Sequence, residues 1–147
     1  MAAKTALPLE QLFQGLSDRT RLRLLNLMAD QEVCVCYFVE ILGLSQPVIS
    51  RHLAYLRRRG LVTSRREGKW MHYRIAPLAS TFAAQLLSVV LNCLASDAAM
   101  RRERAQLTRA CCSPNAFINL QGAPRPTAIC GRASAKHAAL KKKVIRP

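Results

Sequence analysis

The sequence is poor in acidic residues. Its 147 residues include 8 Asp and Glu against 23 Lys and Arg, which gives a formal net charge of +15. A solvated surface of mixed charges is the ordinary alternative, but so large an excess favours a polyanionic partner, most simply DNA or RNA.

Long hydrophobic runs are also absent. No apolar stretch approaches the roughly 20 residues that a membrane helix needs, and the N-terminus lacks the apolar segment of a secretory signal. The sequence therefore predicts a cytoplasmic protein with no membrane partner. Disulfides are a poor explanation for cysteines in that compartment, and metal binding or redox chemistry is a better one. The six cysteines are Cys34, Cys36, Cys93, Cys111, Cys112 and Cys130.

Hydrophobic periodicity predicts helices over residues 9–29, with a break at Ser17-Asp18, and over 33–44 and 80–108. Another helix is expected between Ser45, a suitable N-cap, and Gly60, with Pro47 in its first turn. The pattern then alternates over residues 61–67 and 70–75, which predicts a β-hairpin. The expected fold is mainly α with a small β-hairpin (α+β).

The C-terminal part has a different composition. From Ser113 onward it contains seven Lys and Arg, no acidic residue and several prolines. We expect one domain over residues 1–110 and a basic tail over 111–147 that is disordered or loosely attached.

Two helices joined by a tight turn and followed by a basic hairpin predict a winged helix-turn-helix. A helix fits the major groove, and its early exposed residues reach base edges, while hairpin cations neutralise phosphate. An ordinary helical hairpin is the alternative, but the basic hairpin and the net charge favour DNA binding. The candidate DNA-binding residues are Ser45, Gln46, Pro47, Ser50, Arg51, His52, Arg65, Arg66 and Lys69.

Four segments together resemble the ArsR/SmtB family of metal-responsive repressors, most closely its arsenic-responsive branch. They are Leu16-Ser17-Asp18-Arg19-Thr20-Arg21-Leu22, Glu32-Val33-Cys34-Val35-Cys36, Ser45-Gln46-Pro47-Val48-Ile49-Ser50-Arg51-His52-Leu53 and Gly68-Lys69-Trp70-Met71-His72-Tyr73-Arg74. The resemblance covers roughly residues 9–100. It implies a non-enzymatic homodimer, built from the first and last helices, here about 8–16 and 80–108. That dimer would bind double-stranded operator DNA over its own promoter and leave when arsenite or antimonite binds.

Within this resemblance, Cys34 and Cys36 are the predicted ligands of As(III) or Sb(III), because thiolates suit thiophilic ions. Residues i and i+2 lie about 200° apart on a regular helix, so both thiols can face one ion only if the helix start is extended or distorted. We expect the ligand to select that distorted conformation and to shift the following DNA-reading helix.

The third ligand is open. Arsenic repressors of this type often carry a third cysteine where this chain has Val39. The candidates are Cys93, Cys111 or Cys112 of either subunit, a hydroxide or an external thiol. A methylated trivalent arsenical is a further alternative, because it needs only two thiolates. Cys111 and Cys112 also form a candidate second metal site. Cys93 is expected to be a buried small hydrophobe, and Cys130 is assigned no role.

Other functions remain alternatives. Zinc-sensing relatives use His and acidic residues on the last helix, but residues 80–108 contain no His. Cadmium- or lead-responsive relatives add thiols from an N-terminal extension, whereas no cysteine precedes Cys34. A thiol redox protein is disfavoured by the absence of Cys-x-x-Cys and of alternating strands and helices. A sequence-neutral DNA binder driven by charge alone is a further alternative.

Overall fold

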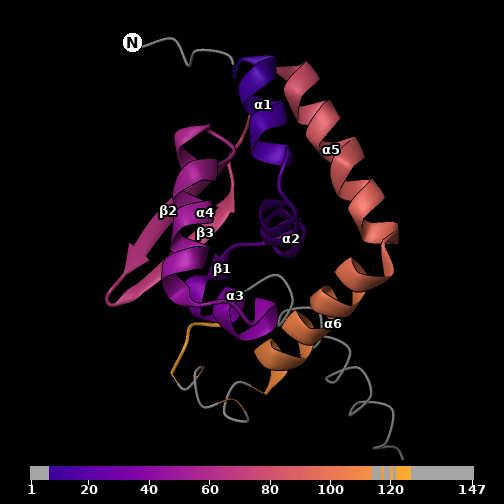
Figure 1. Cartoon of the computed structure of the whole chain (residues 1–147). Coiled ribbons are helices and arrows are strands. Elements are labelled where there is room, and N and C mark those ends of the chain that lie inside the picture. Colours follow the sequence, from indigo (N-terminus) through magenta and orange to yellow (C-terminus); the bar gives the residue numbers. More distant parts are fainter. Residues whose placement is uncertain (1–6, 114–116, 118–119, 121, 127–147) are drawn as a thin grey trace, which may run out of the picture.

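The structure is a computed structural model, and it describes residues 7–113, 117, 120 and 122–126. Its elements follow the predicted order (Figure 1). They are α1 (Leu9–Leu16), α2 (Arg19–Leu27), β1 (Val33–Cys34), α3 (Val35–Leu42), α4 (Gln46–Arg58), β2 (Val62–Glu67), β3 (Trp70–Ile75), α5 (Thr81–Ser96) and α6 (Ala98–Cys112).

The predicted winged helix-turn-helix is confirmed. A tight turn joins α3 to α4, and Gly43 begins it with a φ of 64°, a conformation that glycine adopts without strain. The β2–β3 hairpin that forms the wing turns at Gly68, which also has a positive φ. The two glycines thus set the directions of the recognition helix α4 and of the wing.

The start of the second helical unit differs from the prediction. Val33 and Cys34 form a short strand, β1, which pairs antiparallel with β3 and gives a three-stranded sheet of order β1-β3-β2. Val33 lies opposite Tyr73, and Cys34 lies opposite His72. Pairing with the edge of β3 satisfies backbone groups here, so tertiary structure overrides the helical period.

The helix expected over residues 80–108 is two helices. Asp97 ends α5, and its carboxylate accepts hydrogen bonds from the backbone N–H groups of Ala99 (2.9 Å) and Met100 (3.0 Å), so it caps α6. The axes of α5 and α6 are bent by 88°. No single helix in the described part of the chain has the length and hydropathy to cross a membrane. The bent α5–α6 pair meets that test only when its two helices are taken together.

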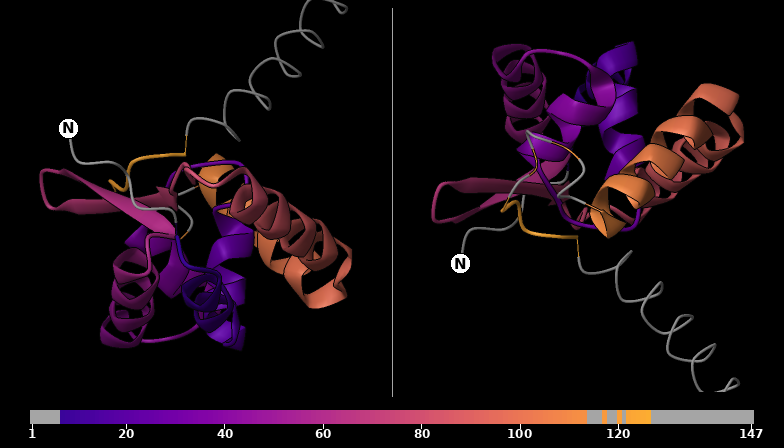
Figure 2. Two further views of the ribbon diagram at one scale, coloured as in Figure 1. Left: turned by 90° about the horizontal axis from the view of Figure 1, so that it is seen from above. Right: turned by 90° about the horizontal axis from the view of Figure 1, so that it is seen from below.

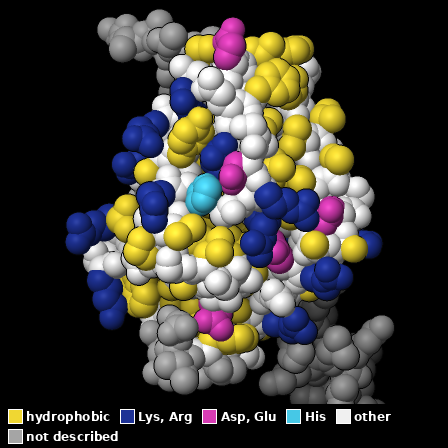
Figure 3. All heavy atoms as spheres, in the orientation of Figure 1, with side chains coloured by type: hydrophobic (Ala, Val, Ile, Leu, Met, Phe, Trp, Pro, Cys, Tyr) yellow, Lys and Arg dark blue, Asp and Glu magenta, His cyan; other side chains and the backbone are white. Residues whose placement is uncertain are grey.

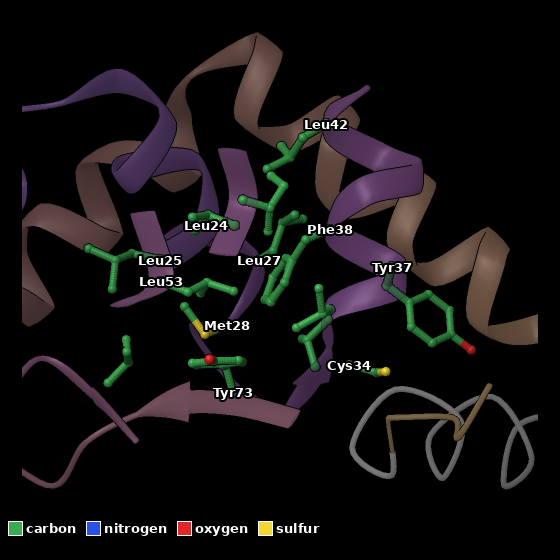
Figure 4. Close-up of a cluster of buried hydrophobic side chains, with 14 of the residues drawn as sticks. Leu24, Leu25, Leu27, Met28, Cys34, Tyr37, Phe38, Leu42, Leu53 and Tyr73 are labelled. Carbon is green, nitrogen blue, oxygen red and sulfur yellow. The ribbon is translucent and has the colours of Figure 1, made fainter. Parts of the chain in front are cut away.

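Helix α6 folds back onto the domain and packs against α2 and α3. The side-chain amide of Asn26 donates to the carbonyl of Met100 (3.1 Å), and Arg23 pairs with Glu103 at 2.6 Å. These contacts fix α6 to the core, which is built mainly from α2, α3 and α4 (Figure 4).

The described residues beyond α6 differ from the loose attachment expected after Ser113. Leu120 and Ala123 are buried in the same core cluster as Cys34. Both views of Figure 2 place residues 122–126, in orange to yellow, on the side of the sheet away from α4. The boundary at residue 110 stays a prediction, and residues 127–147, with Cys130, lie outside the described part.

Candidate thiol site and nucleic-acid interface

Cys34 and Cys36 lie together at the junction of β1 and α3. Cys34 has extended backbone angles (φ −72°, ψ 144°) and stands at the N-cap position, while Cys36 is in the first turn of α3. Their Sγ atoms are 3.1 Å apart, with the Cys36 thiol donating to Cys34. The extended helix start that two-thiol binding requires is therefore part of this fold. It is limited to Val33 and Cys34.

The two thiols have different proton affinities. The hydrogen bond from the Cys36 thiol is the largest cause that lowers the pKa of Cys34 to about 7, with backbone N–H groups helping and burial opposing. The pKa of Cys36 is raised, because its proton is held by Cys34 and because burial and the neighbouring negative charge disfavour a second thiolate. Above about pH 7 the pair thus holds mainly one thiolate and one thiol, a good starting state for a thiophilic ion.

The other described cysteines, Cys93, Cys111 and Cys112, do not complete a three-ligand site with this pair. Cys111 is fully buried on α6, whereas its neighbour Cys112 is exposed, because adjacent helical residues point about 100° apart. Cys93 is exposed on α5, so the expectation that it is buried is wrong for this chain. Within the ranges that the structure describes, no three Cys, His, Asp or Glu side chains are grouped closely enough to hold one metal ion.

Helix α4 presents the predicted DNA-reading residues at its N-terminal end. Ser45, Gln46, Pro47 and Arg51 are exposed and Ser50 is half-buried, while the opposite face carries Ile49, Leu53 and Leu56 into the core. Ser45 is the N-cap residue as predicted, but its hydroxyl makes no capping bond. That hydroxyl and the Gln46 amide are therefore accessible to a groove edge.

His52 has a partner inside the protein. Its Nδ1 lies 3.5 Å from Oδ1 of Asp18, the carboxylate that caps α2 by accepting from the Arg21 backbone N–H. The contact joins α4 to the start of α2. A role for His52 in DNA contact stays a prediction, but the structure gives this side chain a packing role that the sequence did not reveal.

The three wing cations predicted to bind DNA have different surroundings. Arg66 and Lys69 are exposed beside the hairpin turn, with Arg66 donating to the Gly68 carbonyl (3.0 Å) and Lys69 over the Trp70 ring. Arg65 instead donates to Glu32 Oε1 from Nε (3.1 Å) and Nη2 (2.6 Å), and from Nη1 to Glu67 (3.2 Å). The pKa of Glu32 is held below its ordinary value, chiefly by the hydrogen bond from Arg65.

Sequence reasoning did not identify Glu32 and His72 as residues that lie beside the wing cations. His72 is buried, with Nε2 3.1 Å from Glu67 and Nδ1 3.8 Å from Glu32. The period-2 alternation of the hairpin could have placed residues 65 and 72 on one face, but only the unpredicted strand β1 brings Glu32 and Cys34 beside them.

Basic and hydrophobic side chains gather in different places on the surface. In Figure 3 the Lys and Arg side chains on the left follow α4 and the wing, whereas hydrophobic side chains gather at the top over α1 and α5. The exposed large hydrophobic residues are Leu9 (43%) and Phe13 (51%) on α1, and Phe82 (61%) and Val89 (68%) on α5. Separate polar and apolar surfaces of this kind suit a polyanion and a protein partner, respectively.

Comparison with known proteins agrees with this geometry. The family described as "Bacterial regulatory protein, arsR family" matches residues 18–64. The arsenical resistance operon repressor of Escherichia coli is 46% identical over 84 residues, which cover 56% of this chain and 72% of the relative. The arsenic resistance transcriptional regulator ArsR2 of Pseudomonas putida is 44% identical over 81 residues, 54% of this chain and 70% of the relative.

A solved structure shares the architecture as well as part of the sequence. HlyU from Vibrio cholerae superposes with a TM-score of 0.51 at 31% identity, covering 57% of this chain and 88% of that one. The matched segments include the helix-turn-helix, and the repressor of Escherichia coli is matched over more than two thirds of its own length. This chain belongs to the ArsR family of bacterial regulatory proteins.

Proposed function

We propose that this chain represses an arsenic-resistance operon and leaves its operator when arsenite or antimonite binds to Cys34 and Cys36. The observation that carries the proposal is the 3.1 Å approach of the two sulfur atoms at the start of α3, the first helix of the helix-turn-helix. The printed names of the relatives, an arsenical resistance operon repressor and an arsenic resistance regulator, support the same choice of ligand.

The DNA-bound form uses α4 and the wing. Gln46 and Ser50 read base edges in the major groove and Ser45 and Arg51 flank them, a role that their location at the N-terminal end of α4 supports. Arg66 and Lys69 at the wing neutralise phosphates of the backbone. Sequence discrimination is therefore assigned to α4, and much of the sequence-independent affinity to the wing.

The functional unit is a homodimer joined through α1 and α5. The exposed hydrophobic side chains of Leu9, Phe13, Phe82 and Val89 support this assignment, since monomeric proteins seldom leave such a cluster in water. A two-fold dimer presents two recognition helices to two half-sites of one operator.

A second candidate inducer is a monomethylated trivalent arsenical. It needs two thiolates, and the described residues bring two thiols together without a third ligand nearby. For arsenite the third position is filled by Cys111 or Cys112, a hydroxide or an external thiol. Of the two helical cysteines, Cys111 has the stronger claim because it is buried in the core cluster that contains Cys34.

The test is a DNA-binding titration with the promoter region upstream of the coding sequence. Arsenite, antimonite, a monomethylated arsenical, cadmium and zinc are added separately to the protein–DNA complex. Release by the arsenic and antimony species, lost in Cys34→Ser, supports the proposal. Retention of DNA in the presence of every thiophilic ligand contradicts it, and release by cadmium alone favours a cadmium-responsive repressor.

A further inference from the structure

The thiol site and the wing are joined through one row of the sheet. Cys34 of β1 lies opposite His72 of β3, and His72 in turn lies opposite Arg65 of β2. Directly opposed residues in an antiparallel sheet point to the same face, with Cβ atoms about 5 Å apart. Cys34 therefore lies one strand pairing from β3 and two from β2, the two strands of the wing.

Charged side chains reinforce this row. Glu32, two residues before Cys34, accepts two hydrogen bonds from Arg65, whose remaining terminal nitrogen donates to Glu67. His72 is buried between the same carboxylates, 3.1 Å from Glu67 and 3.8 Å from Glu32. The loop that leads into β1 is thus tied by side chains to both strands of the wing.

These contacts change the role expected for Arg65. Its Nε, Nη1 and Nη2 atoms all donate to carboxylates, so two negative charges stand beside this one cation. A guanidinium in those surroundings adds little attraction for phosphate. Of the three wing cations predicted to bind DNA, Arg66 and Lys69 have no such carboxylate partners among the described residues and remain suited to DNA.

We propose that Glu32, Arg65 and His72 transmit ligand binding from the thiol pair to the wing, and that Arg65 is a positioning residue rather than a phosphate ligand. The inference rests on the proposed function. Ligand binding that displaces Cys34 relative to Cys36 moves β1 against β3, and the Glu32–Arg65 contact turns that movement into a new orientation of Arg66 and Lys69. Both sites bias the same element, as an allosteric link requires.

The test compares Glu32→Gln with Asp30→Asn in the full-length chain. Both variants remove one carboxylate charge from the same loop, but Asp30 pairs with Arg104 of α6 and not with the wing. Fluorescence anisotropy gives the Kd for the promoter duplex with and without saturating arsenite, and ultraviolet absorbance of the arsenic–thiolate bonds gives arsenite binding. Thermal unfolding checks that each variant is folded.

We expect arsenite to raise the Kd about tenfold or more in the wild type and in Asp30→Asn, within the usual range of allosteric coupling. In Glu32→Gln the change should fall below about threefold, while arsenite binding is retained. If arsenite releases Glu32→Gln as well as Asp30→Asn, the transmission route is refuted and the proposed function stands. If arsenite releases neither the wild type nor Asp30→Asn, the proposed function itself fails and the inference fails with it.

Variants of Arg65 give a second, independent test of the role assigned to this residue. Each phosphate contact contributes about 0.9 to the slope of log K against log salt for duplex DNA. We expect Arg66→Gln to reduce that slope by about one and Arg65→Gln to leave it unchanged while reducing the effect of arsenite. Arg65→Lys keeps the charge but loses the fork that holds Glu32, so it should also reduce the effect of arsenite. A slope lowered equally by Arg65→Gln and Arg66→Gln would make Arg65 a phosphate ligand and overturn its assignment.

Discussion

The thiol of Cys36 donates a hydrogen bond to the sulfur of Cys34 across 3.1 Å, although two positions separated by one residue face apart on a regular helix. The contact exists because Cys34 belongs to β1 and only Cys36 belongs to α3. The pair is therefore both a candidate ligand set and a coupled acid–base pair.

The hydrogen bond between the two thiols predicts that one of them deprotonates at a lower pH than an ordinary cysteine. We expect ultraviolet absorbance to show one thiolate per chain titrating at about pH 7, lost in Cys34→Ser. Cys36→Ala removes the hydrogen bond that lowers the pKa of Cys34, so this step should move up toward about 8.5, the ordinary thiol value. Cys112→Ala, which removes an exposed thiol of α6, is the control and should leave the step near 7.

The same pKa has a consequence for stability. Because the pKa of Cys34 is lower in the folded chain, its contribution to the free energy of unfolding is present above the unfolded pKa and is lost as pH falls through about 7.

The titration of Cys36→Ala also has a contrary outcome. If its thiolate step stays near pH 7, burial and backbone contacts, rather than the second thiol, set the acidity of Cys34.

The class of arsenical depends on Cys111. We expect a monomethylated arsenical to bind Cys111→Ser and Cys112→Ser as it binds the wild type, because two thiolates suffice. Arsenite binding should weaken about tenfold or more in Cys111→Ser only. In that variant the ion keeps the thiolates of Cys34 and Cys36 but loses the third thiolate. Isothermal titration calorimetry measures the affinity of each protein for the monomethylated arsenical and for arsenite. Equal arsenite affinity in all three proteins would assign the third position to a hydroxide or an external thiol.

Dimerisation depends on the exposed hydrophobic surface of α1 and α5. Val89→Glu places a charge at the most exposed of these hydrophobic residues (68%), where an unpaired charge buried in an interface is costly, and should convert the dimer to monomer. Light scattering coupled to size-exclusion chromatography measures the mass. Thr108→Glu adds the same charge at an exposed position of α6 and should remain dimeric. A Val89→Glu dimer of unchanged mass would place the interface on another surface.

The two parts of the DNA interface should respond differently to substitution. Gln46→Ala removes a base-reading amide and should cost about 1–3 kcal/mol on operator DNA, with a smaller loss on random duplex. Arg66→Ala should weaken both by a similar factor, because it removes a phosphate contact. Anisotropy titrations on both duplexes measure the ratio. A Gln46→Ala protein that still distinguishes operator from random DNA would exclude this residue from base reading.

The helices and the hairpin could be predicted because their signals are local. The apolar period of Ile49, Leu53 and Leu56, and the N-cap position of Ser45, both hold in the structure. Strand β1 could not be predicted in the same way, because Val33 and Cys34 are fixed by pairing with Tyr73 and His72, far along the chain.

Two other differences have physical causes. Asp97 offers a capping carboxylate that the apolar pattern of residues 80–108 concealed, although its residue type was a visible signal. The partners of Arg65 and His52 depend on tertiary contacts with Glu32 and Asp18, so a list of polar side chains could not separate candidate DNA ligands from residues with partners inside the protein.

The bend at Asp97 also determines where the last cysteines of the domain are located. A straight helix from Thr81 would carry Cys111 about 45 Å along its axis, at 1.5 Å per residue. A domain of this size has a radius of gyration of only about 13 Å. The capping carboxylate of Asp97 turns the chain back, so that a thiol 75 residues beyond Cys36 joins the core that contains the thiol pair. One aspartate thereby lets both cysteine-bearing regions of the sequence contribute to one hydrophobic core.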